Sequence, residues 1–251
     1  MSGGHAHGLY VHAQTRVHDL APQCKVLATF LFVVAVATTP PRAVWPFAVY
    51  LCLLAAVAVA ARVPPRFLCR RLVFEVPFVA FALLLPFIAG GDTVGLGPLA
   101  VSREGLWAAW NVVAKATLGV TATVLLAATT PVSDLLRGLE ALRVPRAFTS
   151  IASFMFRYGD LVTGEARRMR VARHSRAYDP RWLWHARALA FATGALFLRS
   201  FERGERVYVS MLSRGFEGTL PRRAVAAAPS EWIAALALPL AAAATAGAAW
   251  T

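Results

Sequence analysis

The sequence predicts an all-α, polytopic membrane protein with about five spans and long cytoplasmic helices. Of its 251 residues, 58% are hydrophobic and only 16% are charged, and the mean hydropathy is +0.56. A soluble domain carries about 25% charged residues. Apolar runs of a length that suits a bilayer recur along the chain. The formal net charge is nevertheless +13, so the positive charge must be kept outside the apolar runs.

Five apolar segments are candidates for membrane spans, since a spanning helix needs about 20 mostly apolar residues. They cover residues 24–39, 44–61, 72–89, 106–129 and 232–250. The chain therefore divides into an N-terminal segment (1–23), a four-span membrane domain (24–129), a region of long helices (130–230) and a C-terminal span (231–251). No pattern of a cleaved signal peptide precedes the first span, so we expect the N-terminus to be retained.

The distribution of arginine predicts the orientation of these spans. The loop at residues 61–71 carries four arginines and no acid, and residues 132–230 carry 17 arginines and 8 acids. Cytoplasmic loops carry an excess of basic residues. Both segments are therefore predicted to be cytoplasmic, which places the N-terminus inside and the C-terminus outside.

Two ionisable residues, Glu75 and Lys115, fall within candidate spans. Charges at such positions are candidates for function. Each also has a structural interpretation: Glu75 reaches the cytoplasmic interface, and Lys115 reaches the outer interface or pairs with another helix.

The sequence contains no signature of catalysis or of a cofactor. It has no P-loop, no nucleophile elbow and no zinc-protease motif, and its three cysteines are unpaired in sequence. We therefore expect a protein that is not an enzyme and has no catalytic, metal or cofactor site. His5 and His7 could bind a metal weakly, or belong to a tail with chance histidines. A nucleic-acid partner is disfavoured because the arginines alternate with acids beside the spans, and a membrane enzyme acting on lipid phosphates lacks the required carboxylate pair.

The basic region is organised as helices. A Thr-Pro start at residues 130–131 opens a short amphipathic helix that Pro145 ends. Two long helices are predicted to follow, at about 146–177 and 182–215. Both end in the pattern small-x-x-x-Arg-small, and the candidate docking residues are Ala172, Arg173, Arg176 and Ala177 in the first and Ser210, Met211, Arg214 and Gly215 in the second. Ordinary helix capping is one explanation of such helix ends. The other is docking of the helix ends on a partner protein, because arginine offers a planar donor fork to a partner.

Several stretches resemble the CbiQ family, the transmembrane (T) components of energy-coupling factor (ECF) cobalt transporters. The similar stretches lie at residues 129–145, 154–158, 165–173, 196–208 and 211–218, and His18 to Lys25 is similar to the family's entry to its first span. The resemblance implies two ABC-type ATPases docked on the two arginine tips and a separate substrate-binding membrane protein. Ala177 and Ser210 depart from the family pattern, which has Gly and Ala there.

The resemblance further implies a multi-pass protein of a prokaryotic cell membrane that couples ATP-driven motion to uptake of cobalt or nickel. Two alternatives stay open at this point: a T component for a vitamin such as biotin, and a stand-alone membrane transporter or scaffold.

Overall fold

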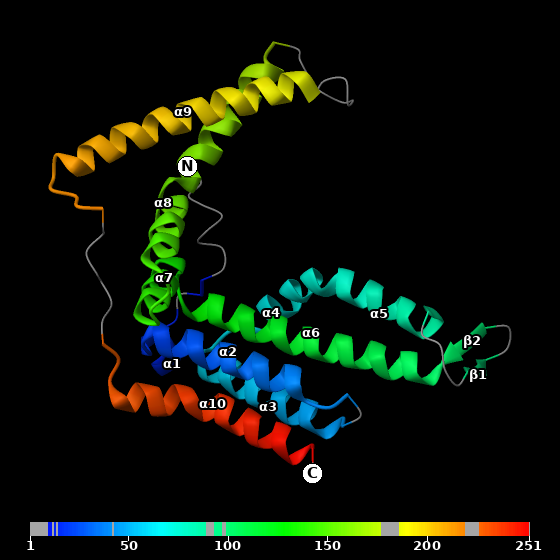
Figure 1. The fold of residues 1–251 in the computed structure, drawn as a ribbon. Helices are drawn as coiled ribbons and strands as arrows, with labels where there is room; N and C mark the ends of the chain where they lie inside the picture. The colour runs from blue at the N-terminus through cyan, green and yellow to red at the C-terminus, as the bar shows by residue number, and fades with distance from the viewer. Residues whose placement is uncertain are drawn as a thin grey trace. The chain divides into compact units, whose positions relative to one another are not determined.

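The computed structural model describes residues 10–11, 13, 15–41, 43–88, 93–96, 99–176, 186–218 and 226–250. Within these ranges the chain is almost entirely helical, as predicted (Figure 1). The helices are α1 (Arg16–Asp19), α2 (Pro22–Thr38), α3 (Trp45–Ala60), α4 (Pro65–Arg71), the 3-10 helix η2 (Leu72–Glu75), α5 (Val76–Ile88), α6 (Arg103–Thr129), α7 (Val132–Ala141), α8 (Arg146–His174), α9 (Ala186–Leu212) and α10 (Pro229–Ala248).

One element was not predicted. An antiparallel hairpin of β1 (Thr93–Leu96) and β2 (Leu99–Ser102) lies in the connection between α5 and α6, where we expected a loop. Its two strands are four residues each, too short to carry the hydrophobic alternation by which a strand is recognised in sequence.

Each of the five predicted spans is a helix or a helix pair. Among the described helices, α6 and α10, of 27 and 20 residues, are long and apolar enough to cross a membrane, and the bent pair of α4 and α5 would make a third span. The apolar helices α2 and α3 are shorter, at 17 and 16 residues. Pro86 lies inside α5 and Pro239 inside α10, as membrane helices tolerate.

The chain forms two compact units. The first contains α8 and α9 and is called the α8–α9 unit; the second, the bundle unit, contains all other elements. Helix α7, within the region expected at 130–230, packs against α2 in the bundle unit. A Cβ on Gly138 of α7 would lie 2.9 Å from the backbone nitrogen of Gln23, so the absent side chain permits this close packing.

Hydrogen bonds at the helix ends define the relative directions of α2, α6 and α10 in the bundle unit. The start of α2 is bonded to the start of α10, where the Ala21 amide donates to Glu231, and the end of α10 is bonded to the end of α2, where the Trp250 indole donates to the Thr38 carbonyl. These two helices are therefore parallel. Helix α6 runs the other way, because Lys25 near the start of α2 donates to Thr129 at the end of α6. These directions agree with an alternation of five spans.

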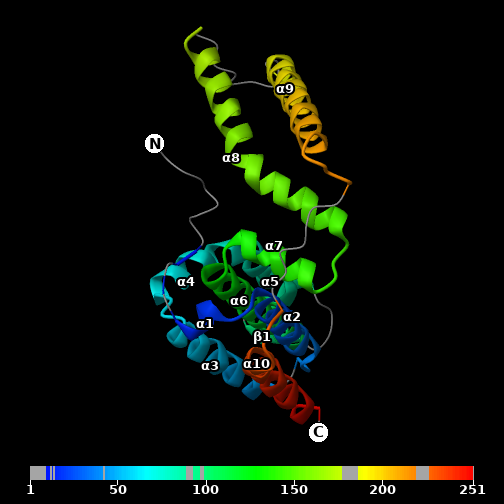
Figure 2. The same cartoon turned by 90° about the vertical axis from the view of Figure 1, so that its left-hand side faces the viewer.

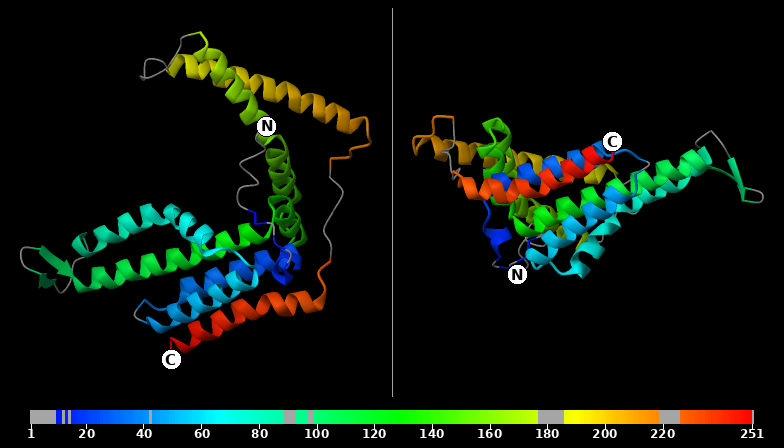
Figure 3. Two further views of the ribbon diagram at one scale, coloured as in Figure 1. Left: turned by 180° about the vertical axis from the view of Figure 1, so that it is seen from behind. Right: turned by 90° about the horizontal axis from the view of Figure 1, so that it is seen from below.

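The core of the bundle lies between α2, α3, α6 and α10, which lie alongside one another (Figure 3). Tyr50 is its central residue: the side chain is fully buried, and its hydroxyl bonds the hydroxyl of Thr39 at 2.8 Å and the carbonyl of Ala242 at 3.4 Å. The rings of Phe32 and Phe47 pack edge-on against it. Many large apolar side chains face outward instead, including Phe30, Leu83 and Ile233, as suits a lipid environment.

Lys115 and Glu75 each bond to a neighbouring helix. The ammonium of Lys115 donates to the carbonyls of Ala37 and Thr39 at 2.7 and 2.9 Å. The last carbonyls of a helix lack partners within it and carry the negative end of its dipole, so Lys115 caps α2. Glu75 is buried and accepts a hydrogen bond from the Thr117 hydroxyl of α6. Of the interpretations left open, the structure therefore supports pairing with another helix for Lys115.

Candidate functional site

The α8–α9 unit carries the predicted docking residues. Helices α8 and α9 have 29 and 27 residues, and at 1.5 Å per residue each is about 40 Å long. The two helices contact each other, and the C-terminal end of α8 and the start of α9 lie at the same end of the pair (Figures 1 and 2). The C-terminal end of α9 lies at the other end of the pair.

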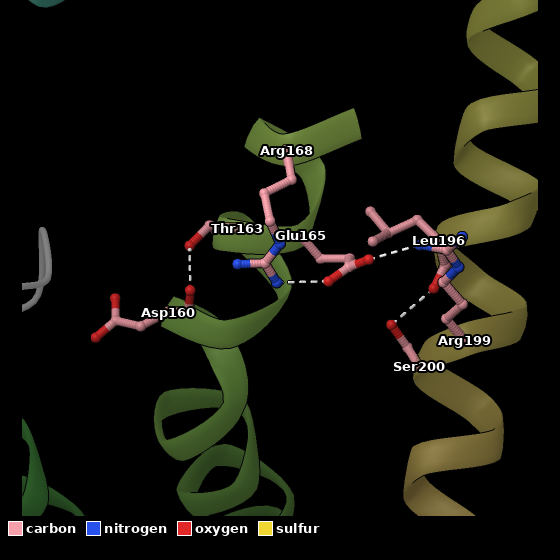
Figure 4. Close-up of polar contacts among 7 residues, drawn as sticks. All are labelled: Asp160, Thr163, Glu165, Arg168, Leu196, Arg199 and Ser200. Atoms are coloured by element: carbon pink, nitrogen blue, oxygen red, sulfur yellow. Dashed lines mark hydrogen bonds and ion pairs between the residues drawn. The ribbon is translucent and has the colours of Figure 1, made fainter. Parts of the chain in front are cut away.

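The contact between the two helices is centred on Glu165 of α8 (Figure 4). Its carboxylate accepts from Arg168 of the same helix at 2.5 Å and from Arg199 of α9 at 2.6 Å. Hydrogen bonds from these two guanidinium groups hold the pKa of Glu165 below its usual range, so the carboxylate is ionised at neutral pH. Within the described ranges, Glu165–Arg199 is the ion pair that joins α8 to α9.

The sequence did not single out this crossing. Glu165 opens the stretch at residues 165–173 that resembles the CbiQ family, which is a usable signal. Its partner Arg199 lies 34 positions away, and nothing in the local pattern pairs the two.

The tip of α9, residues 210–215, has a defined backbone. Gly215 adopts φ +82°, its amide bonds the Leu212 carbonyl at 3.0 Å, and the Phe216 amide bonds the Met211 carbonyl at 3.0 Å. This is the Schellman pattern of a helix end, in which the left-handed residue is normally glycine. The ring of Phe216 packs edge-on against Tyr208 and closes the turn. The prediction of glycine capping here is confirmed.

The side chains at the α9 tip differ in their exposure. Ser210 and Arg214 are exposed, and Met211 is half-buried. The Ser210 hydroxyl bonds the Val207 carbonyl at 2.7 Å. Arg214 has no side-chain hydrogen bond or ion pair with the described part of the chain, so its guanidinium is available to a partner.

The tip of α8, residues 172–177, ends differently. Ser175 caps the helix in a right-handed conformation, and its hydroxyl bonds the Ala172 carbonyl at 3.1 Å. The Arg176 amide bonds the Arg173 carbonyl at 3.1 Å, and the Arg176 side chain is exposed. Ala177, the last predicted residue of this tip, lies outside the described residues.

Arg173 and Arg176 differ in exposure on this tip. Arg173 is half-buried, and its Nε and Nη1 atoms have no hydrogen-bond partner among the residues that the structure describes. Arg176 likewise has no side-chain partner there. Both tips thus present an exposed arginine, but the structure does not bring the two tips together: they lie at different ends of the helix pair.

We expect Gly215→Ala to loosen the α9 tip, because a residue with a Cβ costs roughly 1 kcal/mol or more in the left-handed conformation. Hydrogen exchange of the amides of residues 213–216 should become faster. The matched control is Gly204→Ala in the same helix, where a Cβ would meet nothing within 4 Å and should slow exchange slightly by favouring helix. Equal effects of the two substitutions would contradict the assigned cap.

The histidines of the chain form no metal site within the described residues. His5 and His7 lie outside the described residues, as does His185, and His174 is exposed at the end of α8. Across the described ranges, no group of three His, Cys, Asp or Glu side chains is placed to hold a metal ion.

The fold and the site define a class: a multi-pass helical membrane protein that has, besides its apolar bundle, a separate unit of two long, arginine-tipped helices. The family described as "CbiQ: Cobalt transport protein" matches residues 13–225. The chain therefore belongs to the CbiQ family. It is a transmembrane component of the prokaryotic ECF transporter family and not an enzyme.

Individual relatives agree with this assignment. The cobalt transport protein CbiQ of Rhodobacter capsulatus is 32% identical over 232 residues, which cover 91% of each chain. The energy-coupling factor transporter transmembrane protein EcfT of Heliobacterium modesticaldum is 29% identical over 224 residues, 84% of each chain. The putative fused cobalt transport protein CbiMQ of Methanocorpusculum labreanum is 26% identical over 198 residues, 76% of this chain; the chain spans only 33% of that fused protein.

Proposed function

We propose that the chain couples two cytoplasmic ABC-type ATPases to a separate substrate-binding membrane protein, and that the complex imports cobalt or nickel. The observation that carries the proposal is the presence of two exposed arginine tips at different ends of one crossing helix pair. Tips placed in this way suit two partner subunits, one for each tip, better than a single groove.

The chemistry of the tips supports protein docking. Arginine donates to carboxylates and carbonyls through a planar fork, and the neighbouring Ala172, Ser210 and Gly215 are small enough to enter a groove with the helix end. Since Arg176 and Arg214 have no side-chain partner in the described chain, a partner's acceptors need not displace an existing bond. The small residues Ala177 and Ser210 replace the family's Gly and Ala without adding much bulk.

The helix pair offers a way to transmit motion. Arg176 lies 11 residues beyond Glu165, and Arg214 lies 15 residues beyond Arg199; the rise per residue gives lever lengths of roughly 16 and 22 Å. When the ATPases close on ATP, they would move the tips, and rigid helices would carry this motion past the crossing. The substrate-binding protein would then be displaced and release its load inwards.

The outward apolar side chains of the pair support a protein or lipid neighbour for these helices. They include Phe148, Ile151, Met155, Phe191, Phe197 and Phe201, all at least half exposed. Such faces require cover by lipid or by another protein, and in this proposal the substrate-binding protein supplies part of it.

Cobalt or nickel is proposed as the substrate because one relative, of which the alignment covers 91%, is named a cobalt transport protein. The EcfT relatives carry names without a substrate, so a vitamin such as biotin is the alternative. The substrate itself would be selected by the separate binding protein, as the family resemblance implies.

The test is purification and transport with the genes that flank this one. We expect two ATPase subunits to co-purify with the chain in mild detergent, and proteoliposomes of the full complex to take up radioactive cobalt or nickel with ATP but not with ADP. Uptake of labelled biotin in place of the metals would favour the vitamin alternative. Uptake by the chain alone, without ATPases, would contradict coupling and indicate a stand-alone transporter.

A further inference from the structure

The first turn of α2 holds several segments that are distant in sequence. Its key residue is Lys25, which is only 8% exposed. The Lys25 ammonium donates to the carbonyl of His18 at 3.0 Å and to the carbonyl of Thr129 at 3.2 Å. One side chain thus joins the N-terminal segment, α2 and the last residue of α6, 104 positions away.

The same turn holds α7. Gly138 packs so closely on Pro22 and Gln23 that a Cβ would lie 2.9 Å from backbone atoms of both. Helix α7 is joined to the end of α6 by Thr130 and Pro131 only. Lys25 therefore fixes the end of α6, where the connection begins, and the close packing of Gly138 fixes α7 itself.

The same turn also holds the start of α10. The carboxylate of Glu231 accepts from the Ala21 amide at 3.1 Å and from the Ala228 amide at 2.8 Å. It therefore lies at the N-termini of α2 and α10 together, where a negative charge is favoured by both helix dipoles.

The N-terminal segment is also hydrogen-bonded to the end of α6. The Val11 amide donates to the Ala128 carbonyl at 3.0 Å, and His18 Nε2 donates to the Val11 carbonyl at 3.1 Å. Burial lowers the pKa of His18, so its ring is mainly neutral at pH 7. A neutral ring with the proton on Nε2 leaves Nδ1 to accept from the Thr15 hydroxyl at 2.8 Å.

The order of the elements along the chain links the contacts at the first turn of α2 to the α8–α9 unit. The chain enters the α8–α9 unit from α7 and returns from it into α10. Both connections are thus attached, on the bundle side, to residues 21–25. A displacement of α8 and α9 is transmitted to the bundle through these two attachments. If either attachment were loose, its own movement would absorb the displacement.

We propose that the first turn of α2 is the anchor through which the α8–α9 unit is coupled to the membrane bundle, with Lys25 as its principal positioning residue. The inference rests on the proposed coupling function and adds residues outside the docking tips. Lys25 binds no ATPase and no substrate; it holds the end of α6 in place so that motion of the helix pair is passed on.

The chain supplies a matched control. Lys115 donates to two backbone carbonyls with similar geometry, but at the end of α2, away from both connections. Replacing either lysine with methionine keeps a long apolar stem and removes two hydrogen bonds. The methionine at position 25 would be accommodated because Val17, Ala28 and Leu125 line an apolar pocket beside it.

The first readout is transport by the assembled complex. We expect Lys25→Met to leave ATPase co-purification intact and to lower uptake per ATP hydrolysed about two- to thirtyfold, the usual range for residues that modulate coupling. Lys25→Arg should restore much of the ratio, since arginine can donate to both carbonyls. Lys115→Met should lower thermal stability to a similar degree with little change in the ratio. Equal falls for Lys25→Met and Lys115→Met, or none, would overturn the anchor.

The second readout needs no ATPase and therefore separates the anchor from the proposed function. Spin labels are placed on the exposed Cys52 of α3 and on Ala147→Cys of α8, with Cys69→Ser as background; Cys24 is buried. The distance distribution should broaden in Lys25→Met and not in Lys115→Met. An unchanged distribution would refute the anchor even if the ATPases bind. Should Lys25→Met fail to fold, Glu231→Gln is expected to broaden the distribution in the same way.

Discussion

Replacing Arg176 and Arg214 together with glutamate is expected to abolish co-purification of the ATPases. Both side chains are exposed and have no side-chain partner in the described part of the chain, so the fold should not depend on them. Loss of one partner of a buried, charged interface pair costs about 2–5 kcal/mol, which is roughly thirtyfold or more in Kd for each tip. Reversal of the charge adds repulsion from the same partner carboxylates. The measurement is the stoichiometry of ATPase retained on the affinity-purified chain.

The control reverses the same charges elsewhere on the same helices. Arg157 of α8 and Arg206 of α9 are exposed and lie away from the tips, so Arg157→Glu with Arg206→Glu should retain the ATPases. Each single tip variant should weaken the complex only in part, because the other tip remains. Recovery of a stoichiometric ATPase pair with the double tip variant, folded and at wild-type thermal stability, would show that the tips are not the anchors.

Replacing Gly105 with valine is expected to cause the largest loss of stability among the single changes considered. A Cβ on Gly105, in the first turn of α6, would lie 2.7 Å from both the Leu85 carbonyl oxygen and the Pro86 Cα. These are backbone atoms of α5, so no side-chain rotation relieves the clash. Overpacking of this kind costs about 1–3 kcal/mol. The midpoint of thermal unfolding in detergent should therefore fall by several degrees.

Gly119 is the matched control for Gly105. It lies in the same helix, and a Cβ there would meet nothing within 4 Å. Gly119→Val should therefore change the unfolding midpoint little. A fall as large as that of Gly105→Val would mean that valine is tolerated poorly anywhere in α6, and that the close contact with α5 is not the cause.

Features encoded by neighbouring residues could be predicted from the sequence. The five apolar segments correspond to helical elements because apolar composition is a local property, and α8 ends at His174 and α9 at Leu212, close to the predicted ends. The cap at Gly215 could be predicted for the same reason, since a left-handed helix end selects glycine locally. The candidate docking residues were found as a repeated local pattern, and their role stays a prediction.

Features that depend on contacts between distant residues could not be predicted. The hairpin between α5 and α6 has no strong pattern, and the membership of α7 in the bundle unit depends on its packing against α2. The partner of Lys115 is a helix end 76 to 78 positions away. The sequence marked Lys115 as a candidate for function, and only the position of the carbonyls of α2 revealed its structural role.

The sequence by itself determined the class of protein, the approximate bounds of the apolar helices and the arginine ends of two long helices, because hydropathy, charge and capping act over a few residues. Tertiary structure alone decided where those ends lie on the helix pair, how Glu165 meets Arg199, and that Lys25 holds Thr129. The physical reason is that a buried charge takes its partner from whichever backbone or side-chain group the packed helices bring within about 3 Å. The +13 charge of the chain is a property of its composition. Which of its arginines and lysines bond to other helices depends on how those helices pack.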